Sequence, residues 1–182
     1  MTTGIEKSGY SLSDGDKVTT VMAYTESTLV LGEVITRESI RVSTWLRTQA
    51  IPQFIFFHNA SVMRFSGGTT QPQSLDELHL PSSQVIAFHI KPPACDSLDY
   101  DPAEPMRKME PMTALVGWFR FDGFIRMSTQ TDLQRYLDVS KEIFTTLYDI
   151  DISQPNTPAM GTLHVPYALV RTTSVSFARR RA

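Results

Sequence analysis

Two similar stretches, one in each half of the chain, constrain the fold more than any other feature of the sequence. Gly32–Leu46 combines a strand end, a short turn and one or two amphipathic helical turns that end in leucine. Gly123–Leu137 follows the same pattern about ninety residues later. The alignment pairs further residues: Trp45-Leu46 with Tyr136-Leu137, Phe54 with Phe144, and Asn59 with Asp149.

A tetrapeptide is also shared between the halves. Leu78-His79-Leu80-Pro81 matches Leu163-His164-Val165-Pro166, so we expect His79 and His164 to occupy equivalent positions. The separation of matched residues falls from 91 at the two glycines to 85 here, which places the length differences in loops. We therefore expect an internal duplication.

Each half is predicted to be built mainly from strands, because β-rich runs alternate with short polar turns. In the first half we expect a hairpin of strands 18–24 and 29–35, a short helix within 36–46, a buried strand 54–65, a loop over 66–74, and a closing strand drawn from 78–81 and 85–90. In the second half we expect a hairpin of 113–119 and 120–127 that turns near Phe121-Asp122-Gly123, a helix over 132–137, a strand 144–152, a turn over 154–158, and a closing run 169–177.

The segment between the halves has a different composition. Residues 91–111 hold five of the eleven prolines, interspersed with Asp96, Asp99, Asp101 and Glu104, and show no apolar period, which predicts an extended linker. The expected order is a flexible leader over 1–16, a first β-rich repeat over 17–90, the linker over 91–111, a second repeat over 112–178, and a basic tail over 179–182. Units of about 70 residues are marginally stable alone. We therefore expect an α+β, mainly β fold of two tandem small domains packed as a pseudo-symmetric pair, each an antiparallel sheet or partly open barrel with one short helix.

This order of elements resembles a small bacterial β-rich domain family of unknown function. The resemblance rests on Gly123–Leu137, Phe144–Ile152 and Leu163–Val175 with their counterparts in the first half, and it covers about 140 of the 182 residues. It implies a small twisted sheet or partly open barrel in each repeat. It implies no mechanism.

Composition and charge exclude several classes of partner and compartment. A net charge of −2 gives no general attraction to nucleic acid, and no apolar run is long enough to span a bilayer. Cys95 is the single cysteine, so no intramolecular disulfide can form. The N-terminus lacks the pattern of a secretory signal, so we expect a cytoplasmic protein that can form homo-oligomers and binds neither membrane nor nucleic acid.

One candidate ligand site lies in the first half. Arg37-x-x-x-Arg41 followed by Asn59-x-Ser61 is similar to the signature of PilZ domains, which bind a cyclic dinucleotide on a small β-barrel. An arginine pair can clamp phosphate groups and guanine edges. The PilZ pattern needs a glycine three residues after the serine, where this chain has Arg64.

Other candidate chemistry has a simpler interpretation. No histidine has metal-ligand spacing, so we expect no bound metal and interpret His79 and His164 as structural. We also expect no cofactor. Asp149 and Asp151 alternate on one predicted strand, and we interpret them as a polar strand face. No nucleophile elbow, Walker loop or dinucleotide fingerprint is present. We predict a non-catalytic scaffold, adaptor or regulatory interaction protein that receives a partner strand at an exposed sheet edge or at the Phe-rich strand. The alternative is a small-ligand sensor that uses the Arg37 and Arg41 pair, and an enzyme that uses Asp149 and Asp151 is the third option.

Overall fold

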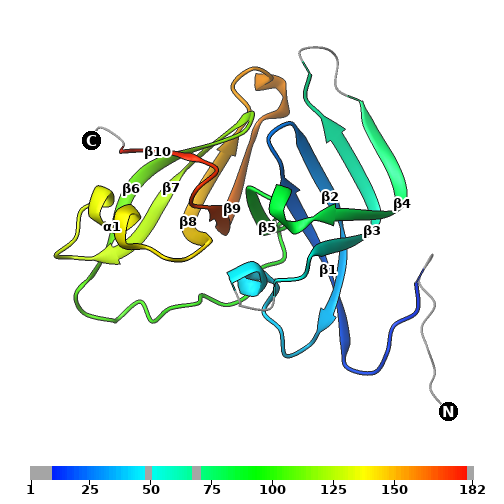
Figure 1. The fold of residues 1–182 in the computed structure, drawn as a ribbon, viewed down its shortest axis with the longest axis horizontal. Helices are drawn as coiled ribbons and strands as arrows, with labels where there is room; N and C mark the ends of the chain where they lie inside the picture. Colours follow the sequence, from blue (N-terminus) through cyan, green and yellow to red (C-terminus); the bar gives the residue numbers. More distant parts are fainter. Residues whose placement is uncertain (1–9, 48–50, 67–70, 180–182) are drawn as a thin grey trace.

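The computed structural model describes residues 10–47, 51–66 and 71–179, and these residues form one ten-stranded antiparallel sheet (Figure 1). The strand order is β10-β6-β7-β8-β9-β5-β1-β2-β3-β4. The mainly β prediction is confirmed. The sheet is open and continuous from β10 to β4, and it does not divide into two separate sheets.

The first half of the chain contributes five strands and a short helical turn. Their bounds are β1 Asp16–Tyr24, β2 Thr28–Arg37, the 3-10 helix η1 Val42–Arg47, β3 Phe54–Arg64, β4 Pro72–Pro81, the 3-10 turn η2 Ser82–Gln84 and β5 Ala87–Ile90. The predicted hairpin and the predicted strand from Phe54 are confirmed. The predicted loop over 66–74 is too long, because β4 already begins at Pro72. The predicted single closing strand is two strands, β4 and β5.

The second half repeats this order of strands. Its elements are β6 Arg107–Val116, β7 Phe119–Ser128, the helix α1 Leu133–Val139, β8 Phe144–Ser153, the 3-10 turn η3 Pro158–Met160, β9 Thr162–Arg171 and β10 Ser176–Arg179. Within the sheet the first half runs β5-β1-β2-β3-β4 and the second half runs β10-β6-β7-β8-β9, so the connectivity is the same. The two halves join where β5 pairs with β9.

A bulge occurs at the same place in both halves. The pairing of β2 with β3 shifts by one residue around Gly32, and the pairing of β7 with β8 shifts in the same way around Gly123. Opposite these glycines, Asn59 has a φ of 49° and Asp149 a φ of 50°, in the left-handed region that Asn and Asp tolerate better than most residues. A bulge of this kind adds a residue to one strand and increases its twist.

The turn of the second hairpin was placed wrongly from the sequence. The strands turn at Gly117 and Trp118, between the paired residues Val116 and Phe119, and Phe121-Asp122-Gly123 lies inside β7. Gly117 has a φ of 55°, which suits a two-residue hairpin turn. A Cβ atom there would lie 2.7 Å from the carbonyl oxygen of Glu26, so this turn packs against the turn of the first hairpin.

Two hydrophobic cores are shared between the halves. The core under the second half contains Tyr24, Leu29 and Phe65 from the first half, together with buried side chains of β6, β7, β8 and β9. The core under the first half contains Phe144 and Leu169 from the second. Each half therefore completes the core of the other, and the described residues give no sign of two independent domains.

The terminal and linking segments also differ from the predicted boundaries. The strand β6 begins at Arg107, so it includes the last five residues of the predicted linker. Of the predicted leader, residues 10–16 lie among the described residues; Asp16 already begins β1, and the Tyr10 hydroxyl donates to Glu33 Oε2 at 2.8 Å. Arg179 of the predicted basic tail belongs to β10, and the rest of the tail lies outside the described residues. Among the helices of the described chain, none is long and apolar enough to cross a membrane.

Candidate functional site

The linker crosses the junction of the two halves and makes hydrogen bonds to both. Its central residues, Asp96 to Tyr100, pass between η1 and the second half (Figure 1). The Ser43 backbone N–H donates to Asp96 Oδ2 at 3.0 Å, close to the start of η1. Arg41 and the Tyr167 hydroxyl both donate to the Ser97 carbonyl, the latter at 3.3 Å. This segment therefore connects η1 with β9.

Arg47 is the centre of the polar network at this junction. Its guanidinium donates to Asp99 Oδ2 at 2.9 Å, to Thr146 Oγ1 at 3.0 Å, and to both carboxylate oxygens of Glu142 at 3.1 Å. Burial lowers the pKa of Arg47, but the hydrogen bond and charge of Glu142 and the charge of Asp99 outweigh burial and raise it. The side chain therefore stays charged and joins the linker, η1 and β8.

Tyr148 extends the network into the second half. Its hydroxyl donates to Asp99 Oδ1 at 2.7 Å, and its ring meets the Tyr100 ring edge-on with centroids 5.0 Å apart. Burial, followed by the hydrogen bond to Asp99, raises the pKa of the Tyr148 hydroxyl. Arg126 lies over the other ring, 4.5 Å from the Tyr100 centroid. Asp99 thus accepts two strong hydrogen bonds, one from each half of the chain.

A polar cavity of about 400 Å³ opens beside this network. Its lining includes four basic side chains and three tyrosines: Arg47, Arg107, Arg126, Lys141, Tyr100, Tyr136 and Tyr148. Asp99 and Glu142 also line it, and Glu104 pairs with Arg126 and with Arg107. The size suits a small organic molecule, and the side chains suit an anionic one.

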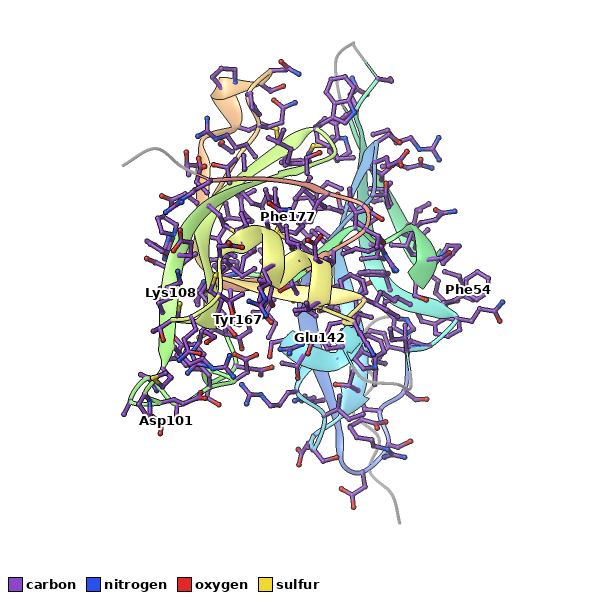
Figure 2. All side chains as sticks on the ribbon, turned by 60° about the vertical axis from the view of Figure 1, so that its left-hand side comes forward. Phe54, Asp101, Lys108, Glu142, Tyr167 and Phe177 are labelled. Carbon is purple, nitrogen blue, oxygen red and sulfur yellow. The ribbon has the colours of Figure 1, made fainter. Side chains whose placement is uncertain are left out.

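A second candidate surface lies at the far edge of the sheet. The strand β4 is the last in the order and pairs with β3, and most of its side chains are exposed. On β3, Phe54 is 38% exposed and Phe56 is 53% exposed. Figure 2 shows Phe54 pointing outward at this edge. The Phe56 ring packs edge-on against His79 of β4, with centroids 4.6 Å apart.

These phenylalanines were interpreted from the sequence as part of a buried strand. In the structure Ile55 and Phe57 are fully buried, whereas Phe54 and Phe56 face outward. A strand alternates its faces, but four consecutive apolar residues hide that alternation from a sequence pattern. Together with Glu77 and His79 of β4, the two exposed rings of Phe54 and Phe56 form a surface that we call the β3–β4 patch.

The predicted ligand residues of the first half each have a partner of their own. Arg37, at the end of β2, is 3.1 Å from Asp16 Oδ1 and donates to the Asp14 carbonyl at 3.0 Å. Arg41 instead contacts the linker at Ser97. Asn59 Nδ2 donates to Glu33 Oε2 at 2.8 Å, and Ser61 lies opposite Leu31 in the sheet. Binding of a cyclic dinucleotide by these residues remains a prediction.

The histidines of the shared tetrapeptide do not occupy equivalent positions. His79 lies opposite Phe56, three residues before Asn59, whereas His164 lies opposite Asp151, two residues after Asp149. The alignment of the two tetrapeptides is therefore shifted by five residues from the alignment of the halves that the strand pairing gives. His164 is exposed, with Nδ1 3.1 Å from Asp151 Oδ1 and Nε2 3.5 Å from Asp149 Oδ1. Within the described ranges, no group of three or more His, Cys, Asp and Glu side chains could hold a metal ion.

His89, which was given no role from the sequence, is the one deeply buried imidazole among the described residues. Its Nδ1 lies 2.8 Å from the Ile90 carbonyl, which can only accept, so Nδ1 carries the proton. Nε2 therefore accepts from the buried Tyr24 hydroxyl at 3.0 Å. Burial lowers the pKa of His89 to about 4, so the ring is neutral at pH 7.

The residues of the junction network were also missed by sequence reasoning. Arg47, Asp99 and Glu142 are far apart in the chain, and no local spacing links them. The weak signal available was the run of acidic residues between Asp96 and Glu104, which contains no basic residue. Comparison with protein-family models, with curated proteins and with solved structures gave no match to this chain.

Proposed function

We propose that this protein is a non-catalytic interaction module that binds an extended segment of a protein partner along β4. The observation that carries the proposal is a ten-residue edge strand beside two exposed phenylalanine rings. An edge strand presents unpaired N–H and C=O groups that an added strand can satisfy, and neighbouring apolar side chains supply affinity and register.

The chemistry of the β3–β4 patch suggests what the partner offers. Phe54 and Phe56 suit an apolar side chain on the incoming strand, and Glu77 suits a basic one. Pro72 and Pro81 mark the ends of β4, and a partner strand fits between them. The single exposed Cys95 fits the reducing cytoplasm in which we place the protein.

We further infer that the two halves derive from one ancestral unit by duplication. Support comes from the shared strand order and from the two bulges, which lie opposite a left-handed Asn or Asp in both halves. The same strand order together with a bulge at the same position in each half favours common descent over coincidence. The resemblance to a small bacterial β-rich domain family stays part of this proposal.

Affinity capture with matched variants tests the interaction function. The variant Phe56→Ser removes an exposed ring from the patch, and Leu115→Ser removes an equally exposed apolar side chain from β6 as a control, since Leu115 is 51% exposed. We expect a protein that is captured by the wild type and by Leu115→Ser and lost with Phe56→Ser. Identical captured proteins for both variants would exclude the patch as the binding surface.

A second candidate function is a sensor of a small anionic ligand, favoured by the basic, tyrosine-lined cavity at the junction. Titration calorimetry with inorganic phosphate and with a cyclic dinucleotide tests it. Heat that disappears in Arg107→Gln but persists in Arg37→Gln assigns the ligand to the cavity, and the opposite result assigns it to the Arg37 and Arg41 pair. No heat with either compound removes the sensor proposal for these ligands.

A further inference from the structure

The two edge strands of the sheet, β4 and β10, correspond to β9 and β5, which pair with each other in the middle of the sheet. When the two halves are aligned on their bulges, β4 of the first half corresponds to β9 of the second, and β5 of the first half corresponds to β10 of the second. The join between the halves is the antiparallel pairing of β9 with β5, where Val170 lies opposite Ala87 and Leu169 opposite Phe88. The free edge of β4 is thus the counterpart of a strand edge that already accepts a partner.

From this correspondence we propose that β4 binds β10 of a second copy of this chain, so that copies join head to tail. The proposal rests on the interaction function at β4 and names its partner. The register follows from the internal join. His58 and Tyr148 directly precede the left-handed residues Asn59 and Asp149, and they pair with Glu77 and Tyr167, so Glu77 in β4 corresponds to Tyr167 in β9. Applied to the free edges, this register sets Leu80 opposite Ser176 of the second copy and His79 opposite Phe177.

The side chains that this register brings together are complementary. Phe177 in β10 corresponds to Phe88 in β5, so the proposed contact between copies and the internal pairing of β5 with β9 both contain a phenylalanine. The same register sets Arg179 of the second copy opposite Glu77, and their side chains are 74% and 58% exposed. An opposite-charge pair directly across two strands stabilises their pairing. Arg179 also contacts Glu110 of its own chain at 3.1 Å, so the pair would bridge two carboxylates.

The structure also predicts that this association is weaker than the internal join. Arg171, next to the internal join, donates to the Val85 carbonyl at 2.8 Å and to the Ser82 carbonyl at 2.7 Å. Pro81 stands at the corresponding place in β4 and can donate no hydrogen bond. The two edges lie on opposite sides of the molecule (Figure 1), so the contact is heterologous and extends into rings or filaments.

Sedimentation velocity over a range of protein concentrations tests the proposal. We expect the wild type to associate with rising concentration, and Glu77→Arg and Arg179→Glu each to weaken association roughly three- to tenfold by placing like charges opposite one another. The double variant Glu77→Arg/Arg179→Glu restores opposite charges and should recover association, although the contact of Arg179 with Glu110 stays lost.

A control variant separates the edge from general charge effects. Arg120 is an exposed residue of β7 whose side chain lies 2.8 Å from Asp122 Oδ2. The variant Arg120→Glu reverses its charge and should leave association unchanged. A wild type that stays monomeric at all concentrations, or a double variant as weak as the single ones, overturns the head-to-tail contact. Should a different protein then still be captured in a Phe56-dependent way, the interaction function at β4 stands without it.

Discussion

The strands β5 and β10 close the two halves in the same way, yet their surroundings differ. Each pairs with the first strand of its half, so that Ile90 and Arg179 occupy corresponding places. All four residues of β5 are buried between β1 and β9, whereas β10 is an exposed edge. The difference shows that burial here is set by the position of a strand in the sheet, and the two sequences differ accordingly: Ala-Phe-His-Ile in the buried β5 and Ser-Phe-Ala-Arg in the exposed β10.

The largest expected effect compares the two bulges. A Cβ atom at Gly123 would lie 2.8 Å from the Tyr148 carbonyl oxygen, and backbone must move to admit it. At Gly32 the nearest atoms are a Phe57 ring carbon at 3.1 Å and backbone atoms of His58 and Ala60 at 3.2 and 3.3 Å, so each neighbour has to move by only a few tenths of an ångström. We expect Gly123→Ala to lower the free energy of unfolding by about 3 kcal/mol and Gly32→Ala by about 1 kcal/mol. Urea denaturation measures both, and equal losses would show that the two bulges are equally tight.

The next effect uses the buried histidine that β10 lacks. His89 has a folded pKa near 4, below the value of about 6.5 in the unfolded chain, so between these values the unfolded state binds more protons. Stability from this group is therefore fully present above pH 6.5 and is lost as the pH falls toward 4, up to about 3 kcal/mol. We expect His89→Gln to flatten the dependence of unfolding free energy on pH in this window.

The exposed His79 supplies the control for this measurement. His79→Gln replaces an imidazole whose side chain is 56% exposed. It should keep the slope of the wild type between pH 4 and 6.5. A slope that His89→Gln leaves unchanged would mean that other groups cause the acid sensitivity.

A smaller effect tests the tie between the halves. Arg47→Met removes the hydrogen bonds to Asp99, Thr146 and Glu142, and leaves the Asp99 side chain, only 10% exposed, without its cation. We expect a loss of about 2 kcal/mol in unfolding free energy, measured by denaturant. The exposed pair of Arg37 with Asp16 is the control, since Arg37→Met should cost less than about 1 kcal/mol. Similar losses would mean that the junction network adds little.

The smallest effect again compares the bulges, now at their left-handed residues. Asp149 is exposed, and Asp149→Gly relieves the left-handed backbone at little cost in contacts, so we expect a gain of about 0.5 kcal/mol. Asn59→Gly relieves the same backbone but loses the hydrogen bond to Glu33, so we expect almost no change. Thermal unfolding of both variants measures the difference, and a greater gain at Asn59 would contradict it.

Local patterns predicted the strands and helices well because each is a matter of a few neighbouring residues. The helix predicted over 132–137 lies within two residues of α1 at each end, and Asp132, predicted as its first residue, is its N-cap, with Oδ1 accepting from the Arg135 N–H at 2.8 Å. The join of β5 to β9 was not predictable, because it depends on pairing between residues about eighty apart. The Leu-His-x-Pro match misled for the same reason, since similar letters do not fix a register.

The candidate sites followed the same division. The sequence named an exposed edge or the Phe-rich strand as the binding surface, but it assigned the phenylalanines of that strand to the interior. The junction network combines side chains from η1, the linker and β8, and only the folded chain brings Arg47, Asp99 and Glu142 together.

The shared cores bear on how the chain folds as it is synthesised. When the first half leaves the ribosome, the outer edge of β5 and the gap filled by Phe144 and Leu169 must wait for residues made much later. Contacts between distant residues also slow folding. The nascent first half therefore exposes an incomplete apolar surface and an open strand edge while about the next eighty residues are made, the condition in which newly made chains depend on chaperones.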